Sequence, residues 1–128
     1  MPLAGVPSAA ADPGPGPLPE PPYIASAVWL SSEGLPTLEV VPTPAGRAVA
    51  GTLGKTPDQG QEAWQEVLAL TSAADTPGMR EQFLCHFDFA ELAQPGKPSW
   101  DLEPWRPVVD QTVMVLTGCN PGGPEVPH

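Results

Sequence analysis

Basic residues are scarce in this sequence, with five lysines and arginines against fifteen aspartates and glutamates. The resulting formal net charge of −10 would repel a phosphate backbone over most of the surface. No apolar run approaches the roughly 20 residues that a transmembrane helix needs. These shortages argue against nucleic acid and anionic membranes as partners, and they predict a soluble protein with no membrane span.

Histidine and cysteine are also rare, at two residues each. A zinc site would need Cys85, Cys119, His86 and a fourth ligand, and the other histidine, His128, is the terminal residue. A nucleophilic Cys85 activated by His86 is also difficult, because neighbours on a helix point about 100° apart. The favoured prediction is a disulfide between Cys85 and Cys119, which would stabilise the fold by roughly 3 to 5 kcal/mol. We expect no cofactor and no bound metal.

The first 22 residues contain little that could join a core. Residues 3–12 resemble the end of a secretory signal with an Ala-x-Ala site before Asp12, and the alternative is a plain alanine- and proline-rich tail. Residues 12–22 hold six prolines in eleven positions, which favours an extended, disordered arm. With two cysteines, this predicts export into an oxidising compartment. We expect one domain over residues 23–121, followed by a flexible tail at 122–128.

Two stretches alternate in the way that β-strands do. In the first, residues 23–31, Ile24, Val28 and Leu30 share one side. The second, residues 35–43, contains two prolines that would confine it to a sheet edge or to short ladders. Glycine-containing turn chemistry between the two stretches predicts a β-hairpin.

The remaining elements are predicted to be helical. A short helix over residues 44–50 follows a Thr-Pro start signal, and residues 61–70 place an apolar stripe at helical spacing. A third helix begins near Thr76 and ends before Pro95. Residues 108–117 alternate like a strand, but an aspartate cap and a following glycine favour a short helix. The predicted fold is α+β, an N-terminal β-hairpin packed on two to three short helices with one disulfide.

Residues 100–107 form a proline-stiffened loop that carries the most function-like side chains. Trp100, Glu103, Trp105 and Arg106 are the candidate binding residues. An indole beside a guanidinium could stack on a sugar or anchor a protein partner, because tryptophan and arginine are the usual hot-spot residues. In the alternative, both indoles cover the core and Arg106 is buried against Glu103.

Three blocks of the sequence carry a family resemblance. They lie at residues 79–86, 100–107 and 119–122, and read Met-Arg-Glu-Gln-Phe-Leu-Cys-His, Trp-Asp-Leu-Glu-Pro-Trp-Arg-Pro and Cys-Asn-Pro-Gly. They resemble the signature blocks of a family of small secreted actinobacterial proteins, described only as a domain of unknown function. The resemblance covers about residues 23–123. It implies export and paired cysteines, and it carries no established activity.

No constellation of residues in this chain identifies a reaction. Asp88, Glu91, Asp101 and Glu103 could supply a glycosidase pair, but acidic residues are too numerous for this to count. Helical carboxylates such as Glu66 and Asp88 are more simply explained as solvated faces. We therefore favour a secreted, non-enzymatic binding module for an extracellular protein or glycan. The alternative is a small secreted carboxylate-dependent hydrolase or lytic protein that acts near the tryptophan loop.

Overall fold

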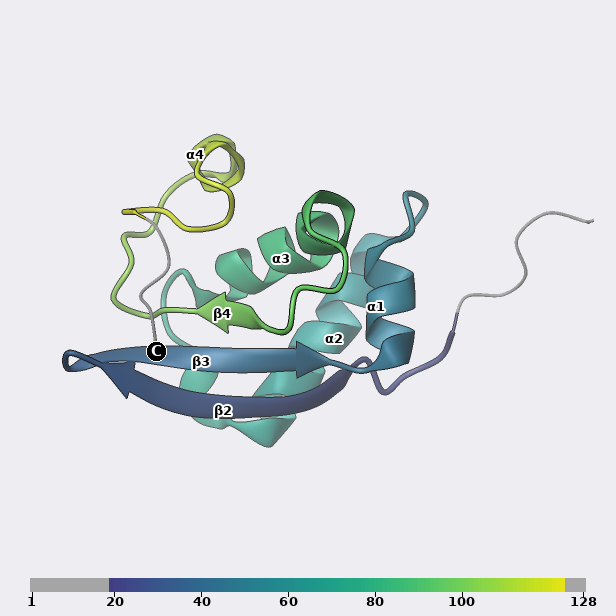
Figure 1. Cartoon of the computed structure of the whole chain (residues 1–128), viewed down its shortest axis with the longest axis horizontal. Helices are drawn as coiled ribbons and strands as arrows, with labels where there is room; N and C mark the ends of the chain where they lie inside the picture. Colours follow the sequence, from purple (N-terminus) through teal and green to yellow (C-terminus); the bar gives the residue numbers. More distant parts are fainter. Residues whose placement is uncertain (1–18, 124–128) are drawn as a thin grey trace, which may run out of the picture.

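The computed structural model describes residues 19–123, which form a three-stranded antiparallel sheet with helices packed against it (Figure 1). The α+β prediction is therefore confirmed. The predicted cleavage site before Asp12 and the greater part of the predicted arm and tail, residues 1–18 and 124–128, lie outside the described residues. In chain order the elements are β2 (Ile24–Ser32), β3 (Leu35–Pro42), α1 (Pro44–Ala50), α2 (Pro57–Leu70), η2 (Ser72–Ala74), α3 (Met79–Ala93), β4 (Trp100–Leu102) and α4 (Gln111–Leu116).

The strands β2 and β3 form the predicted hairpin, with Ser32 opposite Leu35 across the turn. Glu33 and Gly34 make the turn, and their φ angles are 53° and 81°. Two-residue hairpin turns need this left-handed conformation to match the twist of the strands.

The short strand β4 joins the other side of β3, so β3 lies in the centre of the sheet. Of the two alternatives predicted for this strand, a sheet edge or short ladders, the structure shows a short ladder on its second side. The expectation that residues 100–107 form only a loop is wrong, because residues 100–102 are a strand. The ladder between β3 and β4 covers only Leu38 to Val40 of β3. Pro36 and Pro42 lie outside that ladder, so the backbone N–H that each proline lacks is not needed there.

The strand β2 has an irregular register between Ile24 and Ser26. A bulge adds one residue to a strand, so the side chains beyond it change face. Ile24 is buried, whereas beyond the bulge Trp29 packs against the core and Val28 is 50% exposed. The prediction that Ile24 and Val28 share one side of the strand with Leu30 is therefore wrong.

The carboxylate of Glu66, on α2, is bonded at the start of β2. Its Oε1 atom accepts hydrogen bonds from the backbone N–H groups of Tyr23, at 2.8 Å, and Ile24, at 2.9 Å. Glu66 therefore ties α2 to the sheet, and the expectation that it lies on a solvated helix face is wrong.

The helices begin at recognisable caps. Thr43 caps α1 by accepting from Gly46 N–H at 2.9 Å, as its Thr-Pro signal predicts. Helix α2 begins four residues before the expected residue 61, because Thr56 and Pro57 repeat the same signal. The Gln59 side chain completes the cap of α2 by accepting a hydrogen bond from Thr56 N–H at 2.7 Å.

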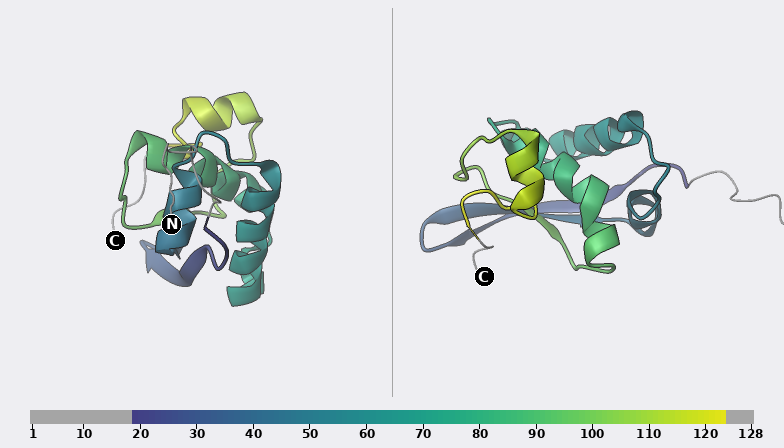
Figure 2. Two further views of the ribbon diagram at one scale, coloured as in Figure 1. Left: turned by 90° about the vertical axis from the view of Figure 1, so that its right-hand side faces the viewer. Right: turned by 90° about the horizontal axis from the view of Figure 1, so that it is seen from above.

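The sequence predicts the start of α4 correctly but not the start of α3. Helix α3 begins after Gly78, whose φ of 86° suits glycine, rather than at Thr76. Residues 111–116 are helical as favoured, and Asp110 caps α4 by accepting from Val113 N–H at 2.9 Å. Helix α4 packs against α3 and lies farthest from the sheet (Figures 1 and 2). Within residues 19–123, no helix is both long and apolar enough to cross a membrane.

An aromatic cluster lies at the centre of the core, between the sheet and the helices. Its members are Trp64, Phe83, Phe87 and Trp100, which are at most 2% exposed. Neighbouring ring centroids are 5.6 to 6.2 Å apart in tilted, stacked and edge-on geometries. Trp100 enters this cluster from β4, so the strand that sequence patterns did not reveal supplies one of its largest side chains.

Candidate functional site

The predicted tryptophan loop is organised around a buried carboxylate. Glu103, directly after β4, is 0% exposed and accepts from Arg106 Nε at 2.7 Å and from Thr37 Oγ1 at 2.7 Å. Its backbone is bonded in both directions by the Gln82 side chain, whose amide donates to Glu103 O and accepts from Glu103 N–H, each at 2.9 Å. A buried charge requires such pairing, because desolvation without a partner is costly.

Arg106 completes this buried cluster. It is 3% exposed, and its Nη1 atom donates to the carbonyl oxygens of Pro121, at 3.0 Å, and Gly123, at 2.6 Å. Its guanidinium carbon lies 4.6 Å from the centroid of Trp105, whose Nε1 donates to Pro36 O at 3.0 Å. The side chain of Arg106 therefore joins the loop to the C-terminal segment.

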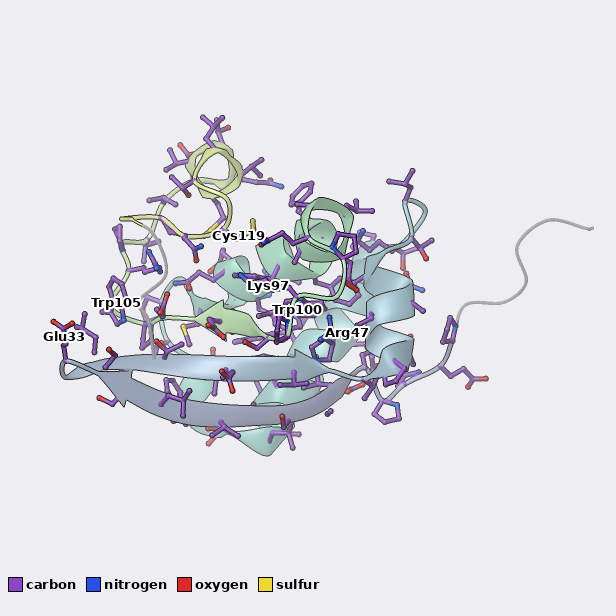
Figure 3. The ribbon with its side chains drawn as sticks, in the orientation of Figure 1. Glu33, Arg47, Lys97, Trp100, Trp105 and Cys119 are labelled. Atoms are coloured by element: carbon purple, nitrogen blue, oxygen red, sulfur yellow. A yellow bond between two sulfur atoms is a disulfide. The ribbon has the colours of Figure 1, made fainter. Side chains whose placement is uncertain are left out.

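The four candidate binding residues differ in the surface they offer. Trp100, Glu103 and Arg106 are buried, whereas Trp105 is half-buried. Figure 3 places Trp105 near the hairpin turn and Trp100 well inside the molecule. The exposed part of the Trp105 ring is therefore the surface that this cluster presents, and its contact with a partner stays a prediction.

Three of the four carboxylates considered for hydrolysis are held by neighbouring groups. Glu103 is bonded as above, Asp101 accepts from the serine hydroxyl two residues before it at 2.8 Å, and Glu91 accepts from a backbone N–H at 2.6 Å. The fourth, Asp88 on α3, lines a hollow between α3 and α4 and a second hollow that reaches Leu53. Among residues 19–123, no group of three His, Cys, Asp or Glu side chains converges as a metal site would require.

The disulfide between Cys85 and Cys119 is confirmed, and it tethers α4 to α3. Together with Met114 and Val109, the two cysteines form a small second cluster apart from the main core. His86 beside Cys85 is 2% exposed, with Nδ1 at 2.8 Å from Gln82 O. The second cluster is therefore the principal attachment of α4 to the rest of the domain.

Three shallow hollows meet at Phe89 on the outer side of α3. The first, about 230 Å³, lies between α3 and α4 and is lined by Leu84, Val109 and Met114 among others. A second of about 250 Å³ reaches the disulfide, and a third of about 270 Å³ reaches Leu53. Phe89 lines all three hollows and is 41% exposed. We call the ring and these hollows the Phe89 surface.

The Phe89 surface gathers charge as well as apolar side chains. Three of the chain's five basic residues line it, and one of them, Arg80, lies 3.8 Å from the Glu81 carboxylate and donates to Gln61 Oε1 at 2.8 Å. Burial raises the pKa of the Asp88 carboxyl, which lines both the first and third hollows, and the ammonium of Lys55 partly offsets this effect. The basic residues are Lys55, Arg80 and Lys97, and the acidic residues are Glu81 and Asp88.

Sequence reasoning did not find the Phe89 surface. The feature of the sequence that indicates this surface is Phe89 itself. It follows Phe87 by two residues, and so its side chain points about 200° around the helix from that of Phe87. Because Phe87 is in the core, a second aromatic on that opposite side had to be exposed or covered by another element. The expectation that Asp88 lies on a fully solvated face also missed its position in two of the hollows.

These features describe a small α+β domain with one disulfide tether and a partly apolar helical face. The chain belongs to the family described as Protein of unknown function (DUF2599), whose match spans residues 24–122. The predicted resemblance to a family of unknown function with actinobacterial members is therefore confirmed.

The similar proteins are mycobacterial and uncharacterized. One from Mycobacterium tuberculosis and one from Mycobacterium bovis are each 48% identical over 133 residues, which covers 96% of this chain and 88% of the relative. One from Mycobacterium leprae is 42% identical over 103 residues, which covers 79% and 80%. No solved structure matches this protein.

Proposed function

We propose that this protein is a binding module without enzymatic activity, that it acts outside the cytoplasm, and that it contacts a protein partner through the Phe89 surface. The observation that carries the proposal is the position of Phe89, an exposed aromatic ring that lines three adjoining hollows. Aromatic side chains that are flanked by apolar pockets are typical anchors at protein interfaces.

Neighbouring residues extend this apolar surface. Leu92 is 43% exposed, Val115 is 43% exposed and Leu53 is 86% exposed, and each lines at least one of the hollows. Single exposed apolar residues need no explanation, but a contiguous group on one face favours an interaction site. The apolar lining favours a protein partner over a glycan.

The disulfide supports action outside the cytoplasm. Structural disulfides form and persist in oxidising compartments, whereas cytosolic thiols are kept reduced. Cys85 and Cys119 are 6% and 5% exposed and pack with Met114, which is the setting of a structural rather than a catalytic pair.

The proposal is tested by capturing partners on immobilised protein from the culture medium of its natural host. We expect wild type to retain a partner that Phe89→Ser loses. Val28→Ser is the matched control, because Val28 is 50% exposed on β2, away from α3. Equal recovery by all three proteins would contradict the proposal, provided that thermal melting shows all three folded.

A further inference from the structure

The outer edge of β2 has no partner strand within residues 19–123, since the order of strands in the sheet is β2-β3-β4 (Figure 1). The strand is nine residues long, from Ile24 to Ser32, and contains neither a charged residue nor a proline. Long edge strands are usually protected by charges, prolines or bulges, because their unpaired N–H and C=O groups attract another strand. In β2 the only such feature is the bulge near Ile24, so the edge beyond the bulge is open to pairing.

The opposite edge of the sheet offers much less to a partner. The strand β4 has only three residues, Trp100–Leu102, and Pro98 and Pro104 lie two residues before and after it. Its middle residue is Asp101, which adds a carboxylate to this edge. Short strands, prolines and charges all discourage edge-to-edge pairing. The edge of this sheet that is suited to accept another strand is therefore β2.

The direction of one carbonyl group identifies the backbone groups at the β2 edge. Pro36 lies opposite Ser31, and its carbonyl oxygen accepts a hydrogen bond from Trp105 Nε1, which comes from the β4 side of β3. Pro36 and Ser31 are therefore a non-hydrogen-bonded pair, in which each residue directs its backbone polar groups away from the other strand. Because this direction alternates along a strand, Ala27, Trp29 and Ser31 direct their N–H and C=O groups outward from the edge.

An antiparallel second copy of β2 matches these outward groups in one register. With Trp29 opposite itself, Ala27 lies opposite Ser31 of the second copy, and all three outward residues exchange N–H···O=C hydrogen bonds. A shift of two residues would instead place Ser31 opposite the bulge or Ala27 opposite the hairpin turn. We call residues 27–31 of both copies, paired in this register, the β2 seam.

The side chains at the β2 seam are compatible with each other. Ala27 and Ser31 are both small, and Val28 lies opposite Leu30 of the second copy in a non-hydrogen-bonded pair, where side chains are closest. Val28 is 50% exposed in the single chain, so this contact removes apolar surface from water. No two carboxylates of β2 meet, because the strand has none. Cross-strand pairs of this kind stabilise a sheet.

The surroundings of the seam are less favourable than the strand itself. Helix α2 packs against β2 and carries three carboxylates and no basic residue. Antiparallel pairing brings both copies of α2 beside the seam, and each chain has a formal net charge of −10. Repulsion between the two copies therefore opposes pairing, and salt screens that repulsion.

We propose that two copies of this chain pair through the β2 seam and join their two three-stranded sheets into one continuous sheet. A second copy is the occupant because the register centred on Trp29 pairs every outward group of β2 with its own copy and brings no charge into the seam. The inference goes beyond the proposed function and does not depend on the Phe89 surface.

Sedimentation over a range of concentrations tests the dimer. We expect the wild type to form a monomer–dimer equilibrium, and Ser31→Pro to raise its dissociation constant at least tenfold, because the N–H that proline lacks makes no bond within the single chain. Ser31→Ala keeps this N–H and is the matched control, with wild-type dimerisation. A wild type that remains monomeric at about 1 mM would overturn the proposal.

Charged variants test the pairing of Val28 with Leu30 directly. The double variants Val28→Glu, Leu30→Glu and Val28→Lys, Leu30→Lys each place like charges opposite each other, so each alone should be monomeric. An equimolar mixture should recover the dimer, because opposite charges then meet across the seam. Attraction between whole chains cannot explain this recovery, since both double variants stay net negative. If both variants melt as folded proteins and their mixture stays monomeric, pairing through β2 is overturned.

Salt and hydrogen exchange distinguish the other possible interfaces and occupants. We expect the dimer to strengthen when NaCl is raised from about 50 mM to about 500 mM, and dissociation by salt would overturn an uncharged seam. The amides of Ala27, Trp29 and Ser31 should be protected from exchange in the dimer. Their protection in a wild-type monomer would assign the edge to another part of the same chain. Rapid exchange in a wild-type monomer would leave the edge for a strand of another protein, and either result overturns the second copy.

Discussion

The Glu103 and Arg106 side chains show how one ion pair can hold several segments together. Arg106 contacts Glu103 of the same turn, the ring of Trp105 and two carbonyl groups of residues 121–123. Both charged side chains have 0% exposure, so neither can return to water if its partner is removed. Removing one partner of such a buried pair leaves an uncompensated charge.

We therefore expect Arg106→Met to lower the free energy of unfolding by about 3 to 5 kcal/mol, measured by urea denaturation. Arg80→Met is the matched control, because the Arg80 side chain is 48% exposed beside Glu81, and its loss should cost less than about 1 kcal/mol. The double variant Glu103→Gln, Arg106→Met should recover part of the loss. Equal stability of Arg106→Met and wild type would contradict the structural role of this pair.

Two measurements on one variant, melting temperature and partner recovery, distinguish the predicted binding role of Trp105 from a structural role. The indole donates to Pro36 O and stacks on Arg106, so we expect Trp105→Ala to lower the melting temperature. Partner recovery per folded molecule should stay unchanged if Trp105 only covers the fold. Loss of recovery at unchanged folded fraction would instead place the partner on the tryptophan loop.

Gly46 in α1 is required by close backbone contact with the residue before β2. A Cβ atom at this position would collide with the Tyr23 carbonyl oxygen and lie 2.9 Å from its carbon. We expect Gly46→Ala to destabilise the protein by about 1 to 3 kcal/mol, because backbone atoms must move to make room. Gly54→Ala, where nothing lies within 4 Å, is the control and should be near neutral in the same thermal melts.

The charge of Asp88 should cost stability at neutral pH. Burial raises the pKa of its carboxyl above the ordinary value of 3.8. A carboxyl whose pKa is higher in the folded than in the unfolded protein favours folding when it is protonated. This contribution to stability is complete below the unfolded-state pKa and is lost as the pH rises through the folded-state pKa. Urea denaturation should therefore show Asp88→Asn more stable than wild type at pH 7, with the difference shrinking toward pH 3.5. A more stable wild type at pH 7 would contradict this.

At the scale of elements, α4 depends on its tether more than on its packing. Of its side chains only Met114 is buried, and Leu116 is 79% exposed. The disulfide and Val109 complete the small cluster that holds α4 on α3. Helices this short are unstable alone, so tertiary attachment decides whether α4 forms.

We expect the double variant Cys85→Ala, Cys119→Ala to lose about 2 to 5 kcal/mol of unfolding free energy. Hydrogen exchange should show the loss of protection concentrated at α4, including Met114 N–H and Thr117 N–H, which bond within that segment. The amides of β3 should stay protected, because that strand packs in the main core. Uniform loss of protection would contradict a separate attachment of α4.

Local signals predicted the elements that local chemistry determines. The Thr43-Pro44 start, the Asp110 cap and the hairpin turn each depend on residues within four positions of one another. The start of α2 is determined in the same local way, because Thr56 and Pro57 repeat the Thr-Pro signal of α1.

Other features depend on pairing between distant segments. The bulge in β2 exists only relative to β3, and β4 is a strand because Trp100 and Leu102 meet Val40 and Leu38. Likewise the Phe89 surface depends on how much of α3 the tethered α4 leaves uncovered. The disulfide could be predicted from composition. The burial of Glu103 could not, because it depends on Thr37 of the adjacent strand, which donates to its carboxylate.

At the scale of the whole molecule, export remains a prediction of the sequence. The cleavage site expected before Asp12 lies outside residues 19–123. We expect protein recovered from culture medium to begin at about Asp12, which N-terminal mass analysis of the secreted material would show. Retention of Met1, or recovery only from the cytoplasm, would contradict the signal interpretation.

The late position of Trp100 in the chain has a consequence for biosynthesis. While the ribosome is still making the residues before it, β3 has no partner on its second side and the rings of Phe83 and Phe87 lack their edge-on neighbour. A nascent chain of this length therefore exposes both an open strand edge and an uncovered aromatic surface, which are features that favour aggregation. It also cannot complete its core before residue 102 has been added, so a chain that is exported as predicted would still be unfolded over most of its length when it reached a translocation channel.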